Sequence, residues 1–446
     1  MPRRVLLIAY YVPPAGGPAT QRILQFIEHL PATGWDVDVL TVREGAYPNR
    51  DPSLLEAVPG SVTIHRTPSF DPIALYARLK GDDEDDIPAG SLGEDESSVL
   101  ETAARWIRAN FFIPDARIGW WPFAVWRGRT LLESGRYDAL LSSGAPHSVH
   151  LIGRSLHRAT GTPWIADLHD PWTDISYYDE FPHTRWAERL DAHFERSVLA
   201  EASAVTTVSP SWAELFAGKA ENRYAVVENG FDPNDFESVQ PAPADDFVLA
   251  HVGKLYASRN PAALWRALAR LRDDGRIPAL RVHLTGAVDP AVRRTIDRHG
   301  LAPIVTVDGF VPHDEALRRM ARSTLLLLTI EPFAQAVGMI TSKLYEYLAS
   351  GRPVLGVGPP GGDADALLRR HDAGAVVDWG DVERMMDVIT AHYEAWQNGD
   401  PRSGATWGDI QVHNRVQQAQ RLADELDRVG GGGRDDAAAR GVAHDC

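Results

Sequence analysis

The stretch GMITSKLYEYLASGRPVLGVGPPGG, Gly338–Gly362, indicates the fold because one short helix leads directly into a buried strand. Apolar residues recur with helical spacing until Gly351, a natural helix stop, and a continuous apolar run begins at Pro353. The helix carries Lys343 in its first turn and its only acid at Glu346, although the exposed N–H groups of a first turn favour a negative charge. The stretch therefore predicts a helix–strand unit with a cation in an unusual place.

Similar apolar runs alternate with helical stretches along the whole chain. In the first half they are Val5–Tyr11, Val37–Val42, Val62–Arg66, Tyr137–Ser143, Trp164–Leu168, Ala204–Ser209 and Tyr224–Asn229. In the second half they are Phe247–Gly253, Leu280–Gly286, Ile304–Phe310, Leu325–Ile330, Pro353–Gly358 and Gly374–Asp378. Continuous hydrophobicity with helices between the runs predicts parallel sheets covered on both faces. We therefore predict an α/β chain of two doubly wound, Rossmann-like domains that face each other across a cleft.

Composition shifts set the predicted domain boundaries. The prediction is an N-terminal domain at 1–231 with an acidic flexible insert at 81–98, a linker at 232–246 and a C-terminal domain at 247–396. A helix at 397–428 is expected to return to the N-terminal domain, and 429–446 is expected to be a disordered tail.

The net charge argues against one class of partner, and the cysteine content favours one cellular compartment. The 446 residues carry a formal net charge of −16, which argues against a nucleic-acid partner. The single cysteine is Cys446, so no intrachain disulfide can form, and a reducing cytoplasm is the simplest compartment. The apolar run at the N-terminus is too short for a signal peptide, and no later run is long enough to span a bilayer.

Two loops of the first half carry candidate site residues. Gly16 and Gly17 follow the first strand, where their N–H groups can approach a sugar hydroxyl or a phosphate, as an ordinary strand-to-helix turn would also allow. His169 and Asp170 follow the strand Trp164–Leu168, where a general base or a substrate-orienting pair is expected, with a structural cap as the alternative.

A metal site is not expected. Asp83-Glu84-Asp85 has the Asp-x-Asp pattern of metal-dependent glycosyltransferases, but it lies inside a solvated acidic run rather than at a strand end. The acids around His169 lack a matching cluster of histidines or cysteines elsewhere. We therefore predict neither a metal nor another cofactor.

Two cations follow the first strand of the second domain. Gly253 ends that strand, and Lys254 and Arg259 come next, before a helix. Such a pair beside a glycine turn can hold a diphosphate, although solvated surface charges would look the same.

With these pieces in order, the chain resembles the retaining glycosyltransferases of the GT-B fold, in the bacterial family 4 group that builds exopolysaccharides, lipid-linked sugars and natural products. The resemblance covers about residues 1–428 and rests on the order of AGG, VVENGFDPNDF, GKLYASRNP, DGFVPHDEAL and SKLYEYLASGRPVL. It implies a sugar-nucleotide donor held by the second domain and an acceptor held by the first.

The resemblance also implies the roles of individual residues. The diphosphate would lie on the helix that begins near Thr341, Glu346 would hold the ribose, and the base would lie near Val311 and Pro312. The implied donor-binding residues are Gly253, Gly286, Val311, Thr341, Ser342, Lys343 and Glu346. The implied catalytic residues are His169, Asp170, Lys254 and Arg259. Gly16, Gly17 and Asn229 are the expected residues of the acceptor-side loops.

The sequence departs from the family pattern at one glutamate. The family has two glutamates separated by seven residues, the first of which contacts the donor sugar, but the position that matches the first one here is Gly338. Glu331 has the right local context yet lies seven residues too early. Either a longer loop returns Glu331 to the sugar, or the contact has been replaced.

The function that follows is metal-independent transfer of a sugar, with retention, from a UDP- or GDP-sugar to a glycan, lipid-linked or small-molecule acceptor. A sugar-nucleotide epimerase and a catalytically silent sugar-nucleotide-binding partner are the alternatives. The segment Arg105–Arg129, rich in Trp, Phe and Arg, either packs a helix onto the sheet or touches the inner face of the membrane.

Overall fold

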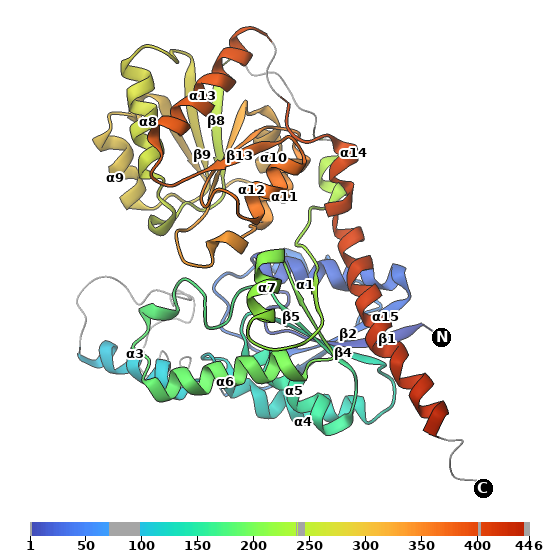
Figure 1. Ribbon diagram of the computed structural model, residues 1–446. Coiled ribbons are helices and arrows are strands. Elements are labelled where there is room, and N and C mark those ends of the chain that lie inside the picture. The colour runs from blue at the N-terminus through green and yellow to red at the C-terminus, as the bar shows by residue number, and fades with distance from the viewer. Residues whose placement is uncertain (1, 71–98, 238, 240–245, 400–402, 441–446) are drawn as a thin grey trace. The chain divides into compact units, whose positions relative to one another are not determined.

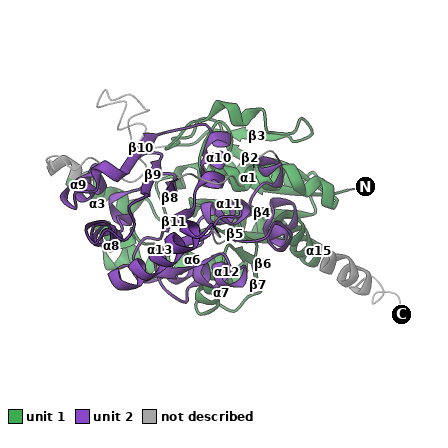
Figure 2. Ribbon diagram, turned by 90° about the horizontal axis from the view of Figure 1, so that it is seen from above, with its two compact units in different colours: residues 1–228, 418–446 green, residues 229–417 purple. Residues whose placement is uncertain are grey.

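The computed structural model describes residues 2–70, 99–237, 239, 246–399 and 403–440 (Figure 1). The chain forms two compact units, the first of residues 1–228 and 418–446 and the second of residues 229–417 (Figure 2). Each unit contains one parallel sheet, so the predicted α/β class with two Rossmann-like domains is confirmed. Every predicted apolar run overlaps a strand.

Unit 1 has a seven-stranded sheet in the order β3-β2-β1-β4-β5-β6-β7. Its strands are β1 (Arg3–Ile8), β2 (Trp35–Val42), β3 (Ile64–Thr67), β4 (Ala139–Gly144), β5 (Trp164–Leu168), β6 (Ala204–Thr207) and β7 (Tyr224–Val226). Its helices are α1 (Pro18–His29), α3 (Val99–Phe111), α4 (Trp121–Leu132), α5 (Ser148–Thr160), α6 (Arg185–Glu201), α7 (Pro210–Ala217) and, from residue 418 onward, α15 (Arg415–Arg440). The strand order reverses between β1 and β4, which is where such sheets usually bind ligands.

The C-terminal helix α15 is part of the core of unit 1. Leu422 and Leu426 are fully buried in the cluster that α1 and the strands β1 and β2 also form. The indole of Trp35 donates to Asp427 at 2.6 Å, and Arg223 donates two bonds to Glu425 at 2.6 and 2.9 Å. These contacts fix the helix on one face of the sheet.

Unit 2 has a six-stranded sheet in the order β10-β9-β8-β11-β12-β13. Its strands are β8 (Phe247–Val252), β9 (Leu280–Thr285), β10 (Val305–Gly309), β11 (Leu325–Thr329), β12 (Val354–Val357) and β13 (Gly374–Val377). Its helices are α8 (Ala262–Asp273), α9 (Pro290–Arg298), α10 (His313–Arg322), α11 (Ser342–Ala349), α12 (Asp363–Arg370), α13 (Val382–Gln397) and α14 (Trp407–Ile410). Here the order reverses between β8 and β11, so their carboxyl ends mark the expected ligand site.

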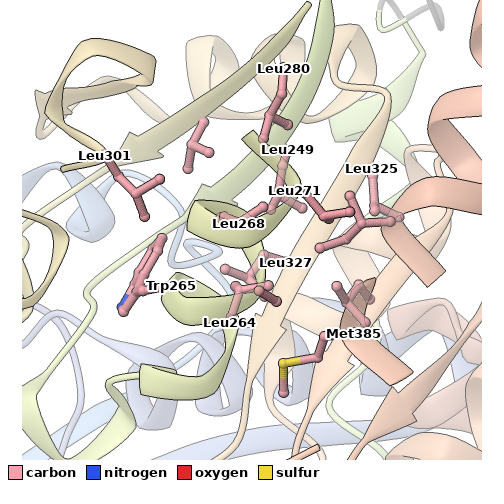
Figure 3. Packing of buried hydrophobic residues seen from close by; sticks show 14 of the residues in the cluster. Leu249, Leu264, Trp265, Leu268, Leu271, Leu280, Leu301, Leu325, Leu327 and Met385 are labelled. Carbon is pink, nitrogen blue, oxygen red and sulfur yellow. The ribbon is translucent and has the colours of Figure 1, made fainter. Parts of the chain in front are cut away.

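Two apolar layers hold the sheet of unit 2. Helices α8, α9 and α13 cover one face, where Trp265 and Met385 pack among leucines of the sheet (Figure 3). Helices α10, α11 and α12 cover the other face, where Leu344 and Tyr347 of α11 are fully buried. The central strands β11 and β12 are therefore buried on both faces, which explains their continuous hydrophobic sequence, whereas the edge strand β10 alternates between partly buried and exposed residues.

The chain differs from the sequence prediction at its C-terminus. Residues 429–440, expected to be disordered, continue helix α15, because extending a formed helix costs much less than starting one. The division between units falls at 228/229 instead of 231, and the returning chain joins unit 1 at residue 418. The insert at 81–98, with Asp83 and Asp85, lies outside the described residues, as do residues 238 and 240–245 of the predicted linker.

Candidate active site

Three glycines line the carboxyl ends of adjacent strands in unit 2. Gly253, Gly286 and Gly309 follow or end β8, β9 and β10 and have φ of 120°, 117° and 70°. The N–H of Gly286 donates to the carbonyl of Gly309 at 2.6 Å, and a Cβ on Gly286 would lie 2.5 Å from the carbonyl oxygen of Gly253. A Cβ at Gly253 or Gly286 would therefore meet a neighbouring group, and the positive φ at all three positions favours glycine.

Lys343 lies against the first of these glycines. A Cβ on Gly253 would be 2.4 Å from Lys343 Nζ, so the ammonium group occupies the space that the glycine leaves. No carboxylate of the described residues lies within ion-pair distance of it. Burial and, after it, Arg259 lower the pKa of Lys343 to about 8, although Glu346 opposes both. Within the described part of the chain, this cation therefore has no partner of opposite charge at close range.

The N-terminus of α11 is also unsatisfied. Thr341 is its N-cap, but its side chain makes no capping bond, and its hydroxyl is buried without a partner. Ser342 opens the helix and is partly buried. Free N–H groups, a buried hydroxyl and the Lys343 ammonium therefore meet at one place, as an anion site requires.

Arg259 is the second cation of this site. It lies in a short 3-10 helix, Ala257–Arg259, after β8, and its Nε is 3.6 Å from Glu331 Oε2. Glu331 follows β11, so the strands on either side of the switch point bring the two side chains together. Lys254, predicted as the other half of the basic pair, is exposed and makes no described ion pair. Arg259 also acts electrostatically on Lys343, whose pKa it lowers.

Glu346 lies on the same helix as Lys343, near a histidine that the sequence does not single out. Burial raises the pKa of Glu346, against the effect of His313. The ring of His313 is 3.1 Å from Asp235, and this contact raises its pKa. A partly buried carboxyl without a described hydrogen bond suits the predicted ribose contact.

The segment predicted to hold the base is open. Val311 is partly buried, whereas Phe310 before it is 93% exposed, directly after Gly309 at the end of β10. An exposed aromatic ring beside a glycine edge is a surface on which a nucleobase can stack.

His169 follows β5 and turns its ring towards the end of the sheet in unit 1. Its Nε2 lies 2.7 Å from Ser143 Oγ and 3.0 Å from Asp167 Oδ2. Ser143 donates its hydroxyl hydrogen to the same carboxylate oxygen at 2.6 Å. If the ring is neutral and donates through Nε2, Nδ1 is the nitrogen that can accept a proton. The described residues provide no hydrogen-bond partner for Nδ1.

Arg22 of α1 holds the carboxylate behind His169. It donates to the two oxygens of Asp167 at 3.0 and 2.7 Å and to the carbonyls of Val227 and Glu228 at 2.8 and 3.1 Å. Although burial alone would raise the pKa of Asp167, Arg22 and His169 hold that pKa well below its usual range. The carboxylate is therefore ionised and fixes the orientation of the imidazole.

The loop that Asp170 opens is fixed by an aromatic side chain. The indole of Trp172 donates to Asp191 at 2.7 Å and stacks on His147, with ring centroids 4.6 Å apart. Burial raises the pKa of Asp191 to about 7 and lowers that of His147 well below its usual range. Asp170 itself is partly buried.

The remaining predicted residues lie in turns. Gly17, with φ of 101°, is the N-cap of α1, and Gly16 before it is partly buried. Asn229 belongs to unit 2 and precedes Gly230, where a Cβ would lie 2.6 Å from the carbonyl oxygen of His413. Their proposed contact with an acceptor stays a prediction.

The comparisons with known proteins agree with this architecture. A model of the glycosyl transferase 4-like domain matches residues 16–230, and a model of the glycosyl transferases group 1 matches residues 246–394. No curated protein matches the sequence.

Solved structures of the same fold cover almost the whole chain. Sucrose-phosphate synthase from Thermosynechococcus elongatus is 17% identical with a TM-score of 0.61, and the match covers 98% of this chain and 100% of that one. The lipopolysaccharide outer core galactosyltransferase WaaB is 14% identical with a TM-score of 0.57, covering 94% and 98%. WaaG, a glycosyltransferase involved in lipopolysaccharide biosynthesis, is 14% identical with a TM-score of 0.53, covering 97% and 98%. The chain therefore belongs to the family 4-like glycosyltransferases with the GT-B fold.

Proposed function

We propose that the protein transfers a sugar from a UDP- or GDP-sugar to an acceptor hydroxyl, with retention of the anomeric configuration and without a metal. The donor binds unit 2, and a glycan, lipid-linked or small-molecule acceptor binds unit 1. The observation that carries the donor assignment is the group formed by Lys343, Arg259 and the uncapped N-terminus of α11 at the switch point of unit 2.

This group matches the charge that develops in the reaction. When the bond between the anomeric carbon and the diphosphate oxygen breaks, negative charge grows on the departing diphosphate. Two fixed cations and free backbone N–H groups stabilise that charge, which is why the proposal includes no metal. In unit 1, the orientation of His169 by Asp167 suits a group that contacts the sugar or the acceptor hydroxyl.

A nucleotide panel tests the donor assignment. Isothermal titration with UDP, GDP, ADP and the matching monophosphates should show a clear preference for one or two nucleoside diphosphates. Glu346→Ala and Phe310→Ala should each weaken that binding. Equal, weak binding of all nucleotides would refute the donor assignment, and unchanged affinity in a variant would remove the role of its residue.

Metal independence has a separate test. Binding and turnover should persist in EDTA. Loss of both in EDTA, restored by manganese, would overturn this part of the proposal.

A silent binding partner remains the second candidate, because Gly338 offers no side chain where the family has its first glutamate. Such a protein would bind the nucleotide but turn over no donor with any acceptor. An epimerase would instead convert the donor with no acceptor present. Product analysis with and without acceptors separates the three functions.

We also propose that the segment Arg105–Arg129 contacts the cytoplasmic face of the membrane. The alternative was that its aromatic residues pack onto the sheet, but most are exposed: Trp126 is 71%, Phe111 68% and Trp106 42% exposed. The segment contains five arginines and one aspartate in a chain of net charge −16. Exposed aromatic rings among arginines suit an anionic lipid surface. None of the described helices combines the length and apolar composition needed to cross a bilayer.

Vesicle co-sedimentation tests the membrane contact. The protein should bind vesicles that contain anionic phosphatidylglycerol more tightly than neutral phosphatidylcholine vesicles. A Trp106→Ala/Trp126→Ala variant should bind less, whereas Trp407→Ala, which removes a 46% exposed tryptophan from unit 2, should not. Equal binding by all three proteins would refute the proposal.

A further inference from the structure

Glu331 is the one carboxylate that the described structure places in ion-pair contact with the cations of the donor site. Its Oε2 lies 3.6 Å from Arg259 Nε, and the two side chains are 22% and 21% exposed. Strands β8 and β11 pair directly, and Glu331 lies two residues after β11, whereas Arg259 lies in the 3-10 helix Ala257–Arg259 that follows β8. The contact therefore lies beside the carboxyl ends of these two strands.

The pairing is incomplete. Arg259 Nε is buried and has no hydrogen-bond partner, since the 3.6 Å contact is longer than a hydrogen bond. A buried N–H without an acceptor is costly, so a better acceptor would displace the carboxylate. Lys343, the second cation, has no carboxylate within ion-pair distance among the described residues.

The charges of this site lead to a specific role for Glu331. We propose that Glu331 is a specificity-determining residue that competes with the incoming diphosphate for Arg259. This inference rests on the proposed function, because it concerns the same donor site. A diphosphate carries two phosphates and can meet both cations, so it must displace the carboxylate from Arg259. A nucleoside monophosphate can bind the N-terminus of α11 and Lys343 alone, where it leaves the ion pair intact.

Two consequences follow. Glu331 lowers the affinity for every ligand that reaches Arg259, including the nucleoside diphosphate product, and it therefore favours product release. Glu331 has much less effect on a ligand bound only at Lys343, because the ion pair with Arg259 already neutralises most of the negative charge of Glu331.

Glu331→Gln tests the role with little change in shape. We would titrate pyrophosphate, UDP, GDP, UMP and GMP into the full chain at constant pH and ionic strength. The variant should bind pyrophosphate and the preferred nucleoside diphosphate about two- to fivefold more tightly, the range expected for a partly exposed ion pair. Its affinity for monophosphates should change by less than about twofold.

Two further variants guard against indirect effects. Glu383→Gln removes a carboxylate that is ion-paired to Arg270 on the surface of the same unit, and it should leave every affinity unchanged. Glu331→Ala should tighten pyrophosphate binding as Glu331→Gln does, which separates loss of charge from a new amide contact.

The inference and the proposed function can fail separately. If pyrophosphate binds the variants no more tightly than the wild type, or does not bind any of them, the competition is refuted, whatever the nucleotides do. If pyrophosphate binding tightens but no nucleoside diphosphate is preferred, the role of Glu331 stands for an anion site and the donor assignment falls. Equal tightening for mono- and diphosphates would also refute the selectivity.

Discussion

Raising the pH from 7 to 9 is expected to weaken the binding of a nucleoside diphosphate to unit 2 by about tenfold, because Lys343 loses its charge in that interval. Burial lowers the pKa of this lysine to about 8. At pH 7 about nine tenths of the molecules then carry the ammonium ion, and at pH 9 about one tenth do. If only the charged form holds the anion, affinity follows this fraction.

The direction in which affinity changes with pH follows from the linkage between anion binding and proton binding. An anion stabilises the ammonium form, so binding raises the pKa of Lys343 and takes up a proton. Affinity is therefore fully present below about pH 8 and falls by up to one decade per pH unit above it, until the pKa of the bound state is reached. The terminal phosphate, with a pKa near 6, stays ionised throughout this range.

The groups near Lys343 do not produce the same slope. The pKa of His251 is lowered to about 3, mainly by burial, so its ring is neutral from pH 7 to 9. Burial raises the pKa of Glu346, and any slope that this carboxyl causes would persist in Lys343→Arg. His313, whose pKa is raised by Asp235, is removed in a His313→Gln control.

Calorimetric titrations of the preferred nucleoside diphosphate at half-unit steps from pH 7 to 9.5 measure the slope. Lys343→Arg should bind throughout and show a flat profile, because a guanidinium group stays charged at these pH values. Lys343→Met should bind weakly, also without a slope. A flat wild-type profile, or the same slope in Lys343→Arg, would refute the reasoning.

Two further predictions concern the frame of each unit. Gly253→Ala should weaken nucleoside diphosphate binding at least tenfold by calorimetry, because its Cβ would lie 2.4 Å from Lys343 Nζ. The control is Gly275→Ala, which also changes a glycine at positive φ but lies in open space, and this variant should bind normally. Arg22→Met should lower the free energy of unfolding by about 3–5 kcal/mol in urea denaturation, because Asp167 would be left as a buried, uncompensated charge. Adding Asp167→Leu should restore part of that loss, and full additivity of the two changes would contradict the pairing.

The fold could be read from the sequence because its main signal is local. Each strand of both sheets is a short apolar run, and the helices between them leave parallel pairing as the natural arrangement. The far end of α15 was missed for the opposite reason. Its continuation through residues 429–440 does not depend on a local apolar pattern, which is absent there, but on the docked helix that precedes it.

The site could be predicted only in part. Some site residues can be recognised from the sequence next to them, such as a glycine at a strand end or a cation in a first helical turn. These residues are Lys343, Glu346 and Gly253. The pair of Arg22 and Asp167 carries none, because its partners are 145 residues apart and are joined only by the tertiary structure. The most that the sequence shows of such a pair is a single polar residue within an otherwise apolar helix or strand.

The cation at the start of α11 can be explained together with Gly253. A buried ammonium group at the positive end of a helix is unfavourable, and a glycine with φ of 120° adds conformational entropy to the unfolded chain. The two features meet, because the Lys343 ammonium group occupies the space that the missing Cβ of Gly253 leaves. Lys343 and Gly253 are each locally unfavourable, and they meet at the switch point of the sheet. Because neither residue improves packing, a bound ligand explains them better than stability does. An anion bound there would reverse the field that Lys343 experiences, and this is why the pH profile of binding, rather than the stability of the free protein, is the measurement that reports on it.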